Sequence, residues 1–118
     1  MRMEFPYREE SSSLFGKIYR PIAKVWFKGR TWMPAFMYVD SGADVTLIPK
    51  SFGELLGFQL ESSKIQEIKG IGEGTVPVSQ NIAWALIDTV PFLLGRLDIL
   101  DKFDITFTER EVIFVERC

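Results

Sequence analysis

The tripeptide Asp40-Ser41-Gly42 directly follows an apolar run over residues 32–39 and is the stretch best suited to chemistry. The run predicts a strand buried on both faces, so a carboxylate at its end needs a use or a partner. Ser41 adds a hydroxyl that can donate and accept hydrogen bonds, and Gly42 has no Cβ, so another chain can come close. Because all three are also common turn residues, the tripeptide alone predicts only a turn that presents an acid.

A glycine-rich stretch, Gly70-Ile71-Gly72-Glu73-Gly74, could cradle a phosphate group. Its context disfavours a nucleotide-binding loop, because no Walker-type lysine follows it and no helical pattern begins there. The flanking residues 65–69 and 75–79 are β-like instead. The stretch therefore predicts the mobile tip of a β-hairpin, with Ile71 as its apolar end.

Composition excludes several classes of chemistry. The chain of 118 residues is 47% hydrophobic and 14% aromatic, which predicts one folded domain. It has no histidine, which excludes Ser-His and Cys-His catalysis and histidine-ligated metals. Cys118 is the only cysteine, so an internal disulfide and a cysteine-rich zinc site are excluded, and we expect no metal and no cofactor.

The charge and the apolar runs bear on partners and location. The formal net charge is -2, which does not predict nucleic-acid binding by bulk electrostatics. No apolar run is long enough to span a membrane, and the N-terminus has no signal-peptide core, so we expect no membrane partner and a cytoplasmic location.

Residue patterns predict an all-β fold with one or two short helices. We expect residues 1–16 to be an N-terminal tail or interface segment and residues 17–118 to be a single domain. Short helices are expected after Pro49, ending at Gly57, and over residues 97–102. A strand is expected over residues 18–27, and because Pro21 cannot donate to a ladder, this strand should lie at a sheet edge or break at Pro21. The other expected strands cover residues 32–39, 65–69, 75–79, 81–90, 91–94, 104–108 and 112–115.

Three motifs, taken together, resemble retropepsin-like aspartic proteases. Val39-Asp40-Ser41-Gly42-Ala43-Asp44 resembles the catalytic loop of that family, and Ile68-Lys69-Gly70-Ile71-Gly72 resembles its glycine-tipped flap. Phe92-Leu93-Leu94-Gly95-Arg96 resembles its second motif, which precedes a short helix. The motifs occur in the family's order, and the resemblance covers roughly Lys17 to Val115. The resemblance implies an acid-protease β-barrel with one Asp-Ser-Gly lobe per chain.

The resemblance implies a homodimeric aspartic endopeptidase that hydrolyses peptides or proteins. In such an enzyme, two carboxylates share a proton: one activates a water and the other polarises the peptide carbonyl. The chain has a single Asp-Ser-Gly sequence, so Asp40 must meet Asp40 of a second chain across a two-fold axis.

The family motifs imply roles for the neighbouring residues. Asp40, Ser41 and Gly42 would form the catalytic loop, and Asp44 would pair with Arg96 in a buried ion pair. The apolar segment 112–115 would lie at the dimer interface. The residues expected to contact substrate are Ala43, Asp44, Gly70, Ile71, Gly72, Leu93 and Leu94.

The sequence also allows an alternative function that is not enzymatic. The interval between the glycine-rich stretch and Phe92 is short for the family, which commonly fits an additional hairpin there. A non-catalytic, protease-like module that dimerises or binds extended peptides would fit such a shortened chain.

Overall fold

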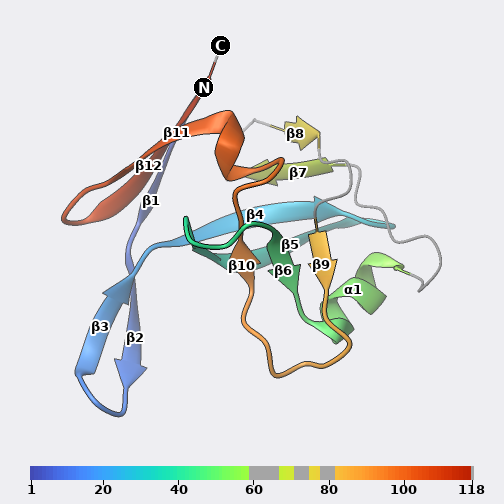
Figure 1. Cartoon of the computed structure of the whole chain (residues 1–118), viewed down its shortest axis with the longest axis horizontal. Coiled ribbons are helices and arrows are strands. Elements are labelled where there is room, and N and C mark those ends of the chain that lie inside the picture. The colour runs from blue at the N-terminus through green and yellow to red at the C-terminus, as the bar shows by residue number, and fades with distance from the viewer. Residues whose placement is uncertain (59–66, 71–74, 78–81, 118) are drawn as a thin grey trace.

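The protein is a mainly β structure with one α-helix among its described residues (Figure 1). The structure is a computed structural model that describes residues 1–58, 67–70, 75–77 and 82–117. No helix within these ranges has the length and apolar character needed to cross a membrane. The predicted all-β class with short helices is confirmed.

A seven-stranded sheet carries the Asp40 motif. Its strand order is β8 (Thr75–Pro77), β7 (Glu67–Gly70), β4 (Ile22–Lys28), β5 (Trp32–Val39), β10 (Leu93–Leu94), β6 (Thr46–Ile48) and β9 (Ile82–Trp84). β10 lies between β5 and β6, parallel to the first and antiparallel to the second. The loop that joins β5 to β6 therefore passes the end of β10, which brings two distant motifs together.

The two ends of the chain pair in a three-stranded sheet. β12 (Glu111–Glu116) lies between β1 (Arg2–Pro6) and β11 (Phe103–Phe107), antiparallel to both, so the termini lie close together (Figure 1). The prediction of a tail over residues 1–16 is therefore wrong for β1, whose Phe5 is only 2% exposed. The alternative, that residues 1–16 form an interface segment, stays a prediction.

A second part of the N-terminal region forms a hairpin of its own. β2 (Arg8–Ser12) pairs with β3 (Gly16–Arg20), and this arm projects from the body of the domain (Figure 1). Pro21 separates β3 from β4, which confirms the predicted break, because proline cannot donate to a strand ladder. The alternative of an edge strand is wrong for β4, which pairs with both β5 and β7.

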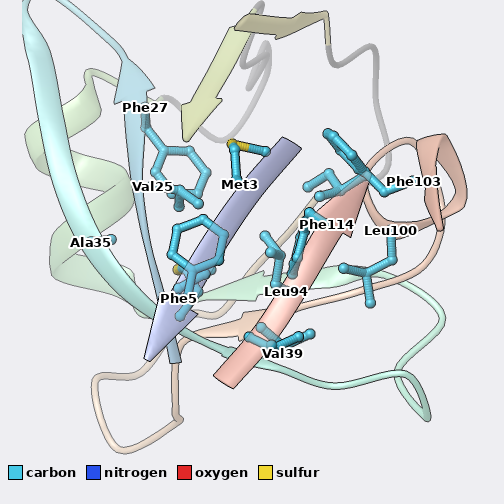
Figure 2. Close-up of a cluster of buried hydrophobic side chains, with 14 of the residues drawn as sticks. Met3, Phe5, Val25, Phe27, Ala35, Val39, Leu94, Leu100, Phe103 and Phe114 are labelled. Atoms are coloured by element: carbon cyan, nitrogen blue, oxygen red, sulfur yellow. The ribbon is translucent and has the colours of Figure 1, made fainter. Parts of the chain in front are cut away.

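The hydrophobic core fills the space between the two larger sheets (Figure 2). The ring of Phe114 lies 5.3 Å from that of Phe5 and 5.4 Å from that of Phe103, centroid to centroid. Val112 is also fully buried, whereas Val115 is 38% exposed. Segment 112–115 therefore packs one face into its own chain, and only its other face remains for the predicted dimer interface.

β5 is buried on one face only, which corrects the expectation of two buried faces. Ala35, Met37 and Val39 lie in the core, but Phe36 is 48% exposed. The hairpin supplies the partial cover, with the Arg8 guanidinium 3.9 Å from the centre of the Phe36 ring. The expected strand over 81–90 is likewise shorter: β9 ends at Trp84, and Leu86 lies in an exposed bend.

The predicted helix after Pro49 is confirmed as α1 (Lys50–Leu56), and Gly57 ends it in the left-handed conformation with φ 91°. The second helix is shorter than expected: residues 96–99 form turns before the 3-10 helix η1 (Leu100–Lys102). At its N-terminus α1 has no side-chain cap of its own. Asp88 provides one from another loop, because its Oδ1 accepts a hydrogen bond of 2.7 Å from the Ser51 N–H.

We expect removal of this distant cap to destabilise the protein in a pH-dependent way. Hydrogen bonds from the Ser51 backbone and side chain hold the pKa of Asp88 below its ordinary value of 3.8, and the positive charge of Lys50 adds to the effect. A lowered folded-state pKa stabilises the protein above the unfolded pKa, and this stabilisation disappears as pH falls through the folded pKa.

Asp88→Ala should therefore lower the urea midpoint at neutral pH, and the deficit against wild type should shrink below about pH 4. Glu109→Ala, which removes an exposed carboxylate from the β11–β12 turn, is the control. A deficit that stays constant with pH would assign the effect of Asp88 to packing rather than to its charge.

Candidate active site

Main-chain hydrogen bonds hold Asp40 at the end of β5. The Asp40 N–H donates to the carbonyl of Leu94 at 3.2 Å, and the Val39 N–H donates to the carbonyl of Pro21 at 2.9 Å. The end of β5 and Asp40 are thus tied to β10 on one side and to Pro21, which directly precedes β4, on the other. Because all of these partners are backbone groups, the position of Asp40 follows from strand pairing.

The Asp40 carboxylate lies in a tight turn. Its Oδ1 accepts a hydrogen bond of 3.0 Å from the Gly42 N–H, and the Asp40 carbonyl accepts one of 3.1 Å from the Ala43 N–H. A Cβ on Gly42 would lie 3.3 Å from Oδ1, so glycine keeps this side of the carboxylate open. Ser41 and Gly42 are both exposed, and an acid presented in this way can meet a ligand or a second chain.

Gly95 locks the second motif against the Asp40 loop. Its N–H donates to Oγ1 of Thr46 at 2.9 Å, and the Thr46 side chain is fully buried. A Cβ at Gly95 would lie 2.2 Å from the carbonyl carbon of Val45. Only glycine, which has no Cβ, avoids this clash. The glycine of the second motif is therefore required by a close approach of two backbones.

The predicted buried ion pair between Asp44 and Arg96 is not found in the part of the chain that the structure describes. Both side chains are exposed, and the two motifs meet through their backbones instead. The Arg96 N–H donates to the Ala43 carbonyl, and the Leu97 N–H donates to the Asp44 carbonyl, both at 2.9 Å. Since the peptide groups face each other here, the two charged side chains point to solvent.

An open hollow of about 430 Å³ borders Asp40, and we name it the near hollow. Leu93 lines it, and its predicted contact with substrate stays a prediction, whereas Leu94 is 1% exposed and belongs to the core. This difference follows from strand alternation, because successive residues of β10 face opposite sides of the sheet. The residues that line the near hollow are Arg20, Pro21, Tyr38, Asp40, Pro91 and Leu93.

A hydrogen-bonded cluster stands beside the near hollow. The Tyr38 hydroxyl donates to both carboxylate oxygens of Glu10, at 2.9 and 2.6 Å, and Arg20 Nε lies 3.1 Å from Glu10 Oε1. The hydrogen bond to Glu10, together with burial and the charge of Glu10, raises the pKa of Tyr38 above 10.0. The phenol therefore remains a donor at neutral pH, and β5 is fastened to the hairpin next to Asp40.

This cluster was not identified as part of the site by sequence reasoning. Tyr38 lies two residues before Asp40, so period-two alternation could have placed it on the same face. Glu10 carries no such signal, because 28 residues separate it from Tyr38.

The glycine-rich stretch lies largely outside the described residues. Gly70 ends β7, where it is paired with Val25 of β4. Ile71 and Gly72, the expected tip of the flap, fall in the gap at residues 71–74, so the predicted flap stays a prediction. Among the described residues, no three acidic or cysteine side chains lie close enough to hold a metal ion.

The fold is similar to that of a known protease. The crystal structure of a retropepsin-like aspartic protease from Rickettsia conorii superposes with a TM-score of 0.66 and 14% sequence identity, covering 97% of this chain and 88% of that one. No protein-family model matches the sequence. No curated protein matches it either. The match confirms the predicted retropepsin-like fold, and at this level of identity it establishes the fold alone.

Proposed function

We propose that the protein is an aspartic endopeptidase that is active as a homodimer. The observation that carries the proposal is the placement of Asp40: it directly follows β5, is held by a backbone hydrogen bond to β10, and borders an open hollow within a retropepsin-like fold. A single half-buried carboxylate next to an open hollow suits proton transfer, but one carboxylate alone is not a complete acid–base pair.

A second chain supplies the missing acid. Ser41 and Gly42 are exposed beside Asp40, so a two-fold axis through this turn would bring two Asp40 side chains together. Carboxylates about 3 Å apart cannot both ionise, a behaviour known for aspartic proteases as a class. One Asp40 then takes a proton from the attacking water, while its protonated twin donates a hydrogen bond to the scissile carbonyl.

The substrate is an extended peptide that lies across the ends of β5 and β10. Its side chains next to the scissile bond enter the near hollow, whose apolar surface comes from Pro21, Pro91 and Leu93. Main-chain hydrogen bonds hold an extended peptide whatever its sequence, and side-chain hollows supply the selectivity.

Cleavage of an unstructured protein tests the proposal. We expect casein to be hydrolysed faster at acidic than at neutral pH, because the pair of Asp40 carboxylates must hold one proton. Sedimentation of the active fractions should give the mass of a dimer. Binding of casein without hydrolysis at any pH would favour the non-catalytic, peptide-binding module. The observation that supports this module is that Asp44 and Arg96 are both exposed and form no ion pair with each other among the described residues.

A further inference from the structure

A second hollow lies on the outer face of β5, next to Phe36 and Tyr38 and further from Asp40 than the near hollow. It has a volume of about 390 Å³ and shares Tyr38 and Pro91 with the near hollow, so the two are adjacent. We name it the far hollow. Its apolar surface comes from Ile22, Phe36, Pro91 and Phe92, and the hairpin strand β2 forms its opposite wall.

The spacing of the two hollows matches that of an extended peptide. Phe36, Tyr38 and Asp40 alternate along β5, so about 7 Å separates each from the next on the outer face. Alternate side chains of an extended peptide have the same spacing. A peptide with one side chain in the near hollow therefore places the side chain two residues away over Phe36.

The charged groups around the far hollow already have partners. Glu10 contacts Tyr38 and Arg20, and Glu9 Oε1 lies 3.4 Å from Lys17 Nζ. Arg8 is held over the face of the Phe36 ring. A polar side chain that entered the far hollow would lose water and would have to compete with these contacts for a partner, whereas an apolar one would bury surface against Phe36.

We propose that the far hollow is a specificity site for an apolar or aromatic side chain of the substrate, two residues from the one in the near hollow. The inference rests on the proposed function for the register of the peptide. The hairpin β2–β3 is then a specificity element, because β2 provides the wall that turns an open strand face into a pocket.

Binding of a non-hydrolysable peptide tests this assignment. The probe is a six-residue peptide whose central amide is replaced by a hydroxyethylene group, which resembles the hydrated carbonyl and fixes the register at Asp40. Two versions carry leucine or asparagine, which have similar shapes, at the position over Phe36. We expect the leucine version to bind wild-type protein about tenfold more tightly or better in calorimetry.

Phe36→Ala should reduce this leucine-to-asparagine ratio by about threefold or more, because it removes an apolar wall without opening the core. Phe107→Ala is the matched control, since Phe107 is 47% exposed against 48% for Phe36 but lies on β11 in the other sheet. Its ratio should equal that of wild type. A wild-type ratio near one, or equal ratios in wild type and Phe36→Ala, would overturn the proposal.

The outcomes separate this inference from the proposed function. If casein is cleaved but the leucine and asparagine peptides bind equally well, the proposed protease function stands and the proposed specificity site is wrong. If the leucine peptide binds more tightly in a way that depends on Phe36, but casein is not cleaved, the specificity site stands and the proposed protease function is wrong. Absence of both binding and cleavage would overturn both.

Discussion

Asp40→Asn should abolish peptide hydrolysis and leave the protein folded. Asparagine has the shape of aspartate and can still accept the hydrogen bond from the Gly42 N–H, so the turn should persist. It can neither take a proton from water nor share one with a partner, and we expect kcat to fall by at least about 10³-fold. Cleavage of casein at its optimal pH measures the loss, and circular dichroism with sedimentation checks the fold and the dimer.

Asp101→Asn is the matched control, because it makes the same change at an exposed position in η1. Its turnover should equal that of wild type. Normal turnover in Asp40→Asn would contradict the assignment of Asp40 as the catalytic acid.

Mixed dimers distinguish a shared site from one site per chain. If each active site needs two Asp40 residues, adding Asp40→Asn subunits to a fixed amount of wild-type protein should lower the activity, because wild-type chains are drawn into inactive pairs. Unchanged activity in subunits that exchange would mean that each chain acts alone.

The sequence predicted those features of the fold that depend on residues close together in the chain. Proline before α1 and glycine after it mark both helix ends, and Pro21 marks the break between β3 and β4. The Asp40 turn was predictable for the same reason, since Gly42 and Ala43 close it through hydrogen bonds to Asp40 itself.

The features that were missed depend on contacts between distant residues. Met3 and Phe5 alternate with charged neighbours, yet the strand they form is stable only because β12 pairs with it from the other end of the chain. Asp88 caps α1 through Ser51, which lies 37 residues earlier, so no local pattern contains this contact. The exposure of Phe36 depends in turn on a hairpin that reaches only part of β5.

The ion pair of Asp44 and Arg96 is the instructive error. The motifs are adjacent as the resemblance implied, but the contact uses the carbonyls of residues 43 and 44 and the N–H groups of residues 96 and 97. A sequence motif records that two segments meet, and it does not record which of their atoms do. Backbone hydrogen bonds therefore hold the two motifs together. The critical residue is Gly95, because it allows the two backbones to approach this closely.

Gly95→Ala should consequently be among the most damaging single substitutions. The added methyl group would lie 2.2 Å from the carbonyl carbon of Val45, 2.3 Å from its oxygen and 2.7 Å from the nitrogen of Thr46. Backbone atoms cannot move aside as a flexible side chain can, so β10 and the 43–46 segment must separate. We expect a loss of about 3 kcal/mol in the free energy of unfolding, at the upper end for overpacking.

Gly16→Ala is the control that isolates the clash. Gly16 has a φ of 71°, so alanine is strained there, but a Cβ at this position meets no atom within 4 Å. Its loss should be about 1 kcal/mol, from backbone strain alone. Urea unfolding of both variants measures the difference, and equal losses would contradict the close packing of Gly95. Because the Asp40 N–H bonds to Leu94, the same displacement should move the Asp40 turn, and under the proposed function Gly95→Ala should lose casein cleavage even under conditions in which it is folded.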